Sequence, residues 1–120
     1  MVFLNIWATW CGPCRAEMPS IEKLHQHFKD EDLTILTVSV DMADIAVVKA
    51  FLEKRGYTFT VLHDPHGNIM EWFHVRLIPV TYLIDRSGNI IAKAVGPRDW
   101  SQDAMIRLFQ LLLKESDENP

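Results

Sequence analysis

Two cysteines at the junction of a predicted strand and a predicted helix constrain this chain more than any other feature. Residues 2–7 form a short apolar run, which is typical of a buried strand. Residues 11–29 carry apolar side chains at helical spacing, and Pro19 is expected to bend that helix. These apolar positions are Met18, Ile21, Leu24 and Phe28. Cys11 and Cys14 are therefore predicted on the first turn of a helix that follows closely on a strand.

The middle of the chain repeats the same alternation. Residues 33–40 are rich in β-branched side chains and predict a second buried strand. Asp44 is a suitable N-cap for the next helix, and Gly56 is a suitable end for it. The apolar stripe of this helix is Ile45, Val48, Phe51 and Leu52. Residues 58–62 predict a short extended segment.

The last half of the chain is predicted to hold a hairpin and a final helix. Residues 63–73 are polar and indicate a loop with a short helix. Residues 79–85 and 89–95 predict strands, and the short turn between them makes the pair antiparallel. The final helix covers about residues 100–114, and residues 115–120 are expected to be a frayed tail. The buried face of this helix is predicted to be Met105, Leu108, Phe109 and Leu112.

This order of elements predicts a single α/β domain over residues 1–120. A unit of two parallel strands and a connecting helix has a right-handed crossover. The hairpin then extends the same sheet. We therefore expect a minimal four-stranded mixed sheet, β-α-β followed by β-β-α, with helices on both faces.

Charge and hydropathy argue against several classes of partner. The formal net charge of −4 disfavours nucleic acid, which binds basic surfaces. No run of about 18 apolar residues is present, so no membrane span is predicted. The first residues resemble a core strand rather than a signal peptide. We expect that an upstream piece, such as an export signal or an anchor, was removed.

The spacing of the cysteines favours redox chemistry. A disulfide between Cys11 and Cys14 closes a very small loop, so it would stabilise the fold little. The N–H groups and the positive dipole end of a helix stabilise a thiolate. Cys-X-X-Cys thiols at such sites have pKa values lowered to roughly 3.5–7.5. We assign Cys11 as the nucleophile and Cys14 as the resolving thiol. Gly12 is expected to allow a tight turn, and Pro13 costs little near a helix start.

Zinc binding is the main alternative use of the two cysteines. Zinc takes about four ligands, and the chain has no second Cys-X-X-Cys. His63 and His66 could complete a site, with His74 as a spare. However, His63 and His66 flank a turn that contains proline and fit an exposed polar loop. We expect no metal, and no cofactor besides a redox-active disulfide between the cysteines.

The segment over residues 7–19, Trp-Ala-Thr-Trp-Cys-Gly-Pro-Cys-Arg-Ala-Glu-Met-Pro, resembles the active-site segment of TlpA/ResA-type thioredoxin-like proteins. The similarity covers nearly the whole chain. It implies the thioredoxin fold and thiol–disulfide oxidoreductase activity. Domains of this family usually begin with further N-terminal elements, which we do not find before residue 2. Other matching segments are Val38-Ser-Val-Asp41, Ile78-Pro79-Val-Thr-Tyr-Leu-Ile-Asp85 and Gly96.

Three positions favour the TlpA/ResA type over thioredoxin itself. Asn5 stands where thioredoxins keep a buried aspartate that helps to move protons, and Thr37 stands where they keep a lysine. Glu17 matches a glutamate beneath the dithiol of ResA-like proteins. The resemblance therefore gives Glu17 a catalytic role, exchanging protons with the thiols. The plain alternative is an exposed first-turn glutamate favoured by the helix dipole.

The resemblance also places substrate-binding groups around the dithiol. Pro79 resembles the cis-proline that faces the dithiol in thioredoxin-fold enzymes, and the plain alternative is a proline at a strand start. A cis bond would let Ile78 offer backbone hydrogen bonds to an extended substrate. Trp10 is expected to shield the thiol and to offer an apolar docking surface. The remaining tryptophans, Trp7, Trp72 and Trp100, are expected to pack in the interior.

The function that the resemblance implies is disulfide reduction outside the cytoplasm, in the periplasm or on the outer face of the cytoplasmic membrane. The substrates would be protein disulfides, such as those of apocytochrome c, and an upstream thiol reductant would recharge the chain, which we expect to be a monomer. One alternative is a general thioredoxin-like reductase or oxidase. Another is a non-catalytic binding module with the same fold. A peroxidase is disfavoured, because the Pro/Thr pattern around a peroxidatic cysteine is absent.

Overall fold

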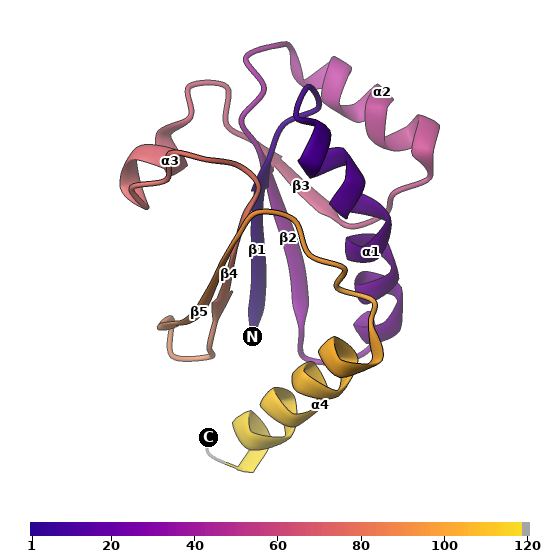
Figure 1. The fold of residues 1–120 in the computed structure, drawn as a ribbon, viewed down its shortest axis with the longest axis vertical. Helices are drawn as coiled ribbons and strands as arrows, with labels where there is room; N and C mark the ends of the chain where they lie inside the picture. Colours follow the sequence, from indigo (N-terminus) through magenta and orange to yellow (C-terminus); the bar gives the residue numbers. More distant parts are fainter. Residues whose placement is uncertain (119–120) are drawn as a thin grey trace.

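A mixed sheet of five strands forms the centre of the molecule, in the order β3-β2-β1-β4-β5 (Figure 1). The structure is a computed structural model and describes residues 1–118. β1, β2 and β3 run parallel, and β4 and β5 run antiparallel to their neighbours. The strands are β1 (Val2–Trp7), β2 (Thr34–Ser39), β3 (Thr60–His63), β4 (Val80–Ile84) and β5 (Ile90–Val95). The helices are α1 (Gly12–Phe28), α2 (Ile45–Arg55), α3 (Asn68–Trp72) and α4 (Asp103–Glu118).

The prediction of a four-stranded sheet is wrong by one strand. Thr60–His63 pairs in parallel with β2, from Leu36 opposite Thr60 to Ser39 opposite His63. This segment is at the sheet edge and is only partly buried. Neither face of this strand is fully covered by other elements. Its short sequence therefore has no run of apolar residues that would predict a buried strand. The strand therefore forms through its partner, and its own residues predict no more than an extended segment.

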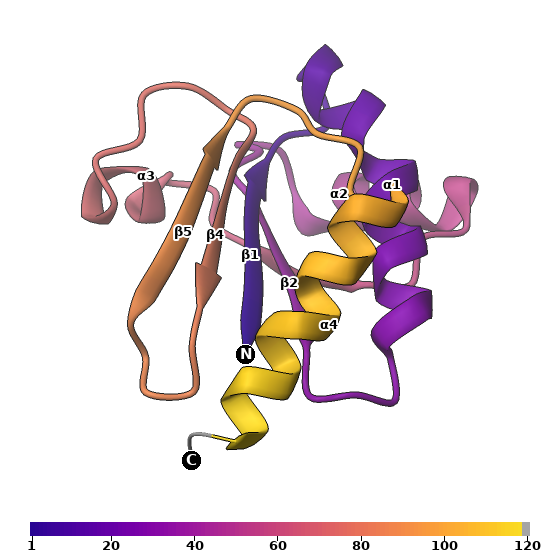
Figure 2. The same cartoon turned by 60° about the horizontal axis from the view of Figure 1, so that its bottom comes forward.

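The helices cover both faces of the sheet, as predicted. The connections β1-α1-β2 and β2-α2-β3 step in the same direction across the sheet, so right-handed crossovers place α1 and α2 on one face. α4 joins them there, and Figures 1 and 2 show α3 apart from these three helices. On the α3 face, the Phe73 ring lies edge-on to Tyr82 of β4, with centroids 4.9 Å apart.

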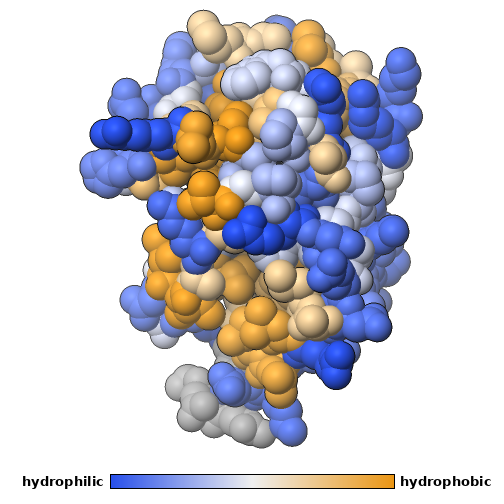
Figure 3. Space-filling view, in the orientation of Figure 1, coloured by the Kyte–Doolittle hydropathy of each residue, from blue (hydrophilic) through white to orange (hydrophobic). Residues whose placement is uncertain are grey.

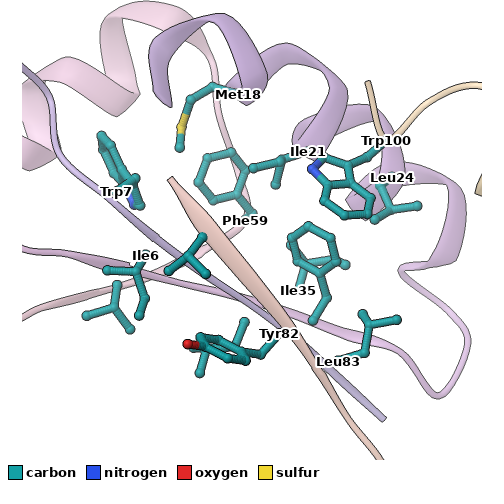
Figure 4. Close-up of a cluster of buried hydrophobic side chains, with 14 of the residues drawn as sticks. Ile6, Trp7, Met18, Ile21, Leu24, Ile35, Phe59, Tyr82, Leu83 and Trp100 are labelled. Carbon is teal, nitrogen blue, oxygen red and sulfur yellow. The ribbon is translucent and has the colours of Figure 1, made fainter. Parts of the chain in front are cut away.

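The core lies mainly between the sheet and the three helices α1, α2 and α4. Phe3 at the centre of the sheet contacts Trp100 and Phe109, with ring centroids 4.9 and 6.1 Å away. Trp7 at the end of the same strand contacts Phe51 of α2. Figure 4 shows the inner face of α1 directed toward the sheet, through Met18, Ile21 and Leu24. This packing thus fixes the position of α1 relative to β1, and with it the position of the turn that joins them.

The helix ends follow the predicted signals closely. The Asp44 carboxylate accepts a hydrogen bond from the backbone N–H of Ala46, which caps α2. Gly56 ends the helix in the left-handed region at φ 72°, which glycine adopts without steric cost. α1 begins one residue later than predicted and continues through Pro19 to Phe28.

Two predictions for the last helix need correction. Leu108 is 43% exposed, and Leu113 is buried in its place, because the buried stripe is centred on Phe109 and continues one turn later. α4 also extends to Glu118, so the first part of the expected frayed tail is helical. Residues 119–120 of that tail lie outside the described residues.

The surface carries scattered apolar side chains among polar ones. In Figure 3, apolar atoms gather at the lower end of the molecule, where α4 lies. Leu108 and Leu111 are exposed on that helix. Trp72, expected in the interior, is 71% exposed at the end of α3. Within residues 1–118, no helix has the length and apolar character needed to cross a membrane.

We predict that Phe109→Ala destabilises the fold by about 3–5 kcal/mol, because it removes a fully buried ring that packs on Phe3, Phe28 and Trp100. Urea unfolding measures the change. Leu111→Ala on the same helix is the matched control, since that side chain is 60% exposed. It should change stability by no more than about 0.5 kcal/mol. Equal losses in the two variants would contradict this description of the core.

Candidate active site

Cys11 and Cys14 form a disulfide at the N-terminus of α1, with their Cα atoms 5.2 Å apart. Cys11 is the N-cap residue, and its Sγ accepts a hydrogen bond from the Cys14 backbone N–H at 3.3 Å. Cys11 is 6% exposed and Cys14 is fully buried. The first sulfur is therefore the one that lies nearer to solvent. It also occupies the site at which helix N–H groups and the dipole favour negative charge.

The turn between β1 and α1 holds the first cysteine in place. The Cys11 backbone N–H donates to the Ala8 carbonyl at 3.2 Å, which closes the turn. Gly12 is the first residue of α1 and does not have a positive φ, and a Cβ there would contact nothing in the described chain. No positive φ therefore requires glycine in this turn, and the supporting role of Gly12 in the site stays a prediction. Pro13 lies in the first turn of the helix, where its missing N–H leaves no hydrogen bond unmade.

The loop before β4 faces the disulfide from the other side. The peptide bond between Ile78 and Pro79 is cis, as predicted, and Pro79 is buried. The Ile78 carbonyl oxygen lies 3.8 Å from Cys11 Sγ. Trp10 is 68% exposed and Leu77 is 70% exposed. The Ile78 carbonyl thus lies next to the more accessible sulfur, and Trp10 and Leu77, the sequence neighbours of Cys11 and Ile78, are open to solvent.

Glu17 lies one turn beyond Cys14 and is 2% exposed. Its Oε1 accepts a hydrogen bond from Asn5 Nδ2, and its Oε2 accepts from the Arg98 backbone N–H and from Trp100 Nε1, all at 2.9 Å. Burial raises the pKa of Glu17 above its ordinary value of 4.5, although the three hydrogen bonds and the Arg98 charge oppose the shift. The alternative of an exposed first-turn glutamate is therefore wrong.

Sequence reasoning missed the residues that hold Glu17. Asn5 was singled out only as a replacement for an aspartate, and its amide also donates to Thr81 Oγ1 at 3.0 Å. Trp100 is buried as predicted, but it is a hydrogen-bond donor as well as a packing residue. The Arg98 contact uses a backbone N–H, which no side-chain pattern reveals. Thr37, in the place of a thioredoxin lysine, instead accepts from Trp7 Nε1.

A cavity of about 410 Å³ lies beside Glu17, between α1 and the loop before α4. Its lining includes Ser20, Lys23, Arg98 and Asp99. These polar groups make it suitable for water. Glu17 is therefore a buried carboxyl that lines a partly polar cavity.

The histidines considered as metal ligands lie elsewhere. His63 Nε2 is 2.9 Å from the carbonyl oxygen of Asp41, to which it can donate. His66 is exposed on the loop before α3. Within the part of the chain that the structure describes, no three His, Cys, Asp or Glu side chains gather as a metal site would require.

Comparison with known proteins identifies the family. The AhpC/TSA family model matches residues 1–93. The thiol-disulfide oxidoreductase ResA of Oceanobacillus iheyensis is 39% identical over 89 residues, which are 74% of this chain and 46% of that protein. The chain spans about half the length of the curated relatives it matches.

Solved structures show the same fold. A protein from Chlorobium tepidum, described as a thiol:disulfide interchange protein DsbE, superposes with a TM-score of 0.82 at 30% identity, over 93% of this chain and 79% of that one. The exposed lipoprotein thioredoxin Etrx1 of Streptococcus pneumoniae gives 0.74 at 28% identity, over 95% and 83%. Together with the cysteine pair at the start of α1, these matches show that the chain is a ResA-like member of the AhpC/TSA family.

Proposed function

We propose that this chain is a thiol–disulfide oxidoreductase that reduces protein disulfides through Cys11 and Cys14. The observation that carries the proposal is the position of Cys11 Sγ. It caps a helix N-terminus, is bonded to a buried partner sulfur, and lies beside an exposed apolar surface. A purely structural disulfide is a poor explanation, because a bridge that closes so small a loop contributes little stability.

The reaction has two exchange steps. The Cys11 thiolate attacks one sulfur of a substrate disulfide, so that an intermolecular S–S bond forms while the substrate S–S bond breaks. One substrate cysteine leaves as a thiolate and takes up a proton. Cys14 then loses its proton and attacks Cys11 Sγ, which closes the Cys11–Cys14 disulfide and releases the second substrate thiolate. An upstream thiol reductant must then return two electrons to this disulfide.

Glu17 is proposed to move the proton of the resolving thiol. Cys14 is fully buried in the disulfide form, so a neighbouring protein group is the natural acceptor for its proton. Glu17 lies on the same helix one turn later, and its raised pKa brings the carboxyl closer to the pH at which thiols exchange protons. The cavity lined by Glu17 and Lys23 gives the proton a route onward to solvent.

The substrate is proposed to bind across Trp10, Ile78 and Pro79. Trp10 supplies an exposed aromatic surface, and the Ile78 carbonyl lies within 4 Å of the reactive sulfur. An extended peptide that pairs with the backbone of Ile78 would bring its disulfide to Cys11 by β-strand addition.

We place this activity outside the cytoplasm. Support comes from the proteins that this chain resembles, which include ResA proteins, a DsbE-type protein and an exposed lipoprotein. Cysteines of apocytochrome c are the substrate class that the family resemblance favours, and a monomer suffices for the chemistry described. The reduction potential distinguishes the two directions of reaction. A reductant such as thioredoxin has a potential of about −270 mV, and an oxidant such as DsbA has one of about −120 mV.

Substitution of each cysteine tests the assignment of roles. Cys11→Ser should abolish the reduction of insulin disulfides, because it removes the attacking sulfur. Cys14→Ser should accumulate a mixed disulfide with the substrate, because nothing then resolves it. Turnover and a non-reducing gel measure the two outcomes. Activity retained by Cys11→Ser would defeat the assignment, and trapping experiments with Cys14→Ser would identify partners.

Glu17→Gln tests the proton role through its pH dependence. Glu17 keeps its proton to higher pH in the folded state than in the unfolded state, so its ionisation destabilises the fold. The free energy of unfolding of the wild type, relative to Glu17→Gln, should therefore decline as pH rises above about 4.5, through the raised pKa of Glu17. The pH profile of Cys14 exchange should also shift.

Glu22→Gln is the matched control for this test. Burial raises the pKa of Glu22, but hydrogen bonds from Gln26, Thr58 and Phe59 outweigh burial, and the pKa is lowered overall. The stability that Glu22 contributes should thus be present above its ordinary pKa of 4.5 and lost as pH falls through the lowered pKa. An unchanged thiol profile in Glu17→Gln would remove Glu17 from the mechanism.

Trp10→Ala should raise KM for a protein disulfide about tenfold, because a central aromatic contact is worth more than about 1 kcal/mol in binding. The rate with a small aromatic disulfide should be unchanged, since the thiol itself is intact. Trp72→Ala is the matched control, because Trp72 is equally exposed at 71% but lies on α3. Equal effects of the two substitutions would argue against a docking role for Trp10.

A further inference from the structure

A buried carboxylate holds the turn that carries the reactive cysteine. Asp41 follows β2 and is 2% exposed. Its Oδ1 and Oδ2 accept from the Thr9 backbone N–H at 3.1 and 3.0 Å, and Oδ1 also accepts from the Thr9 hydroxyl at 2.5 Å. The Ser39 hydroxyl donates to Oδ2. Within residues 1–118, no salt bridge to Asp41 accompanies these bonds.

Thr9 is the middle of the turn between β1 and Cys11. Its carbonyl accepts from Arg15 Nη1 at 3.1 Å, so its N–H, its hydroxyl and its carbonyl are all bonded. The next side chain, Trp10, is mostly exposed and does not anchor the turn by burial. The hydrogen bonds of Thr9 therefore contribute much of what fixes this turn, and most of them end on Asp41.

Burying a carboxylate without a cation is costly unless donors surround it. The donors here belong to the reactive turn and to the end of β2, at the two neighbouring strands β1 and β2. A role in general stability could have been filled by apolar packing at this position. A carboxylate instead gives the turn one defined geometry, because a backbone N–H and two hydroxyls must all be directed at it.

We propose that Asp41 is a positioning residue for the dithiol. Through Thr9, it keeps Cys11 at the N-cap of α1, where its sulfur can rejoin Cys14. The inference rests on the proposed function, since it concerns the geometry of the same exchange reaction. Two thiols held in a fixed relation close a disulfide with a high effective concentration. Releasing Thr9 should lower that concentration and weaken the Cys11–Cys14 disulfide.

The test is the equilibrium between the Cys11–Cys14 pair and glutathione, measured on the full chain. Asp41→Ala removes every acceptor offered to Thr9 and should lower the equilibrium constant for disulfide closure about tenfold. For this two-electron couple, that change raises the potential by about 30 mV. Asp41→Asn keeps the shape and an acceptor for the Thr9 N–H, so it should stay within about threefold of the wild type.

Glu22→Ala provides the matched control. Glu22 accepts from the backbone N–H groups of Thr58 and Phe59 and from the Thr58 hydroxyl, much as Asp41 does from Thr9 and Ser39, but it serves the connection between α2 and β3. Its loss should reduce stability and leave the potential unchanged. An unchanged potential in Asp41→Ala, or an equal shift in Glu22→Ala, would overturn the proposal.

If Asp41→Ala does not fold, Thr9→Val answers the same question, because it removes the hydrogen bond from the Thr9 hydroxyl to Asp41 and keeps the shape of the side chain. It should lower the equilibrium constant for disulfide closure by more than Asp41→Asn does. A constant equal to that of the wild type would refute the positioning role. Failure of the proposed function looks different, because the wild-type chain would then not exchange with insulin or glutathione at all.

Discussion

The site depends on one interaction, the hydrogen bond from the Cys14 N–H to the sulfur of Cys11 at the start of α1. It joins the two cysteines through the helix backbone as well as through their disulfide. Because the helix N-terminus carries unpaired donors and partial positive charge, the sulfur that caps it is the one best able to leave as a thiolate. The different roles assigned to the two cysteines follow from this asymmetry.

The sheet brings distant segments to that helix end. β1 lies in the middle of the sheet, with β2 on one side and β4 on the other. The chain therefore leaves β1 beside the end of β2, which supplies Asp41, and beside the start of β4, which is preceded by Ile78 and Pro79. Positions 30 to 70 residues apart in sequence meet here because a central parallel strand has neighbours on both edges.

The sequence allowed most of the local structure to be predicted, because local signals decide it. The cap at Asp44 and the left-handed Gly56 are clear in the chain itself. The sequence of β3 predicts only an extended segment, since this edge strand gains its stability from pairing with β2. Leu108 was misplaced because apolar residues also occur beside the buried stripe of α4.

The sequence indicates the reactive residues of the site but not the groups that hold them. The cysteine spacing and the family resemblance pointed to Cys11, Cys14, Glu17 and Pro79, which are distinctive residues at fixed spacing. The groups that surround Glu17 and Thr9 could not be found in this way. Arg98 contributes a backbone N–H, and Asp41 contacts a residue 32 positions away, so only the folded chain brings these partners together.

The contacts of Glu17 have a consequence for the C-terminal helix. The same carboxylate oxygen accepts from Arg98 and Trp100, the segment that leads into α4. Protonation of that carboxyl weakens its hold on both donors. If Glu17 exchanges protons with the cysteines as proposed, each redox cycle changes the hydrogen bonds that hold the segment leading into α4.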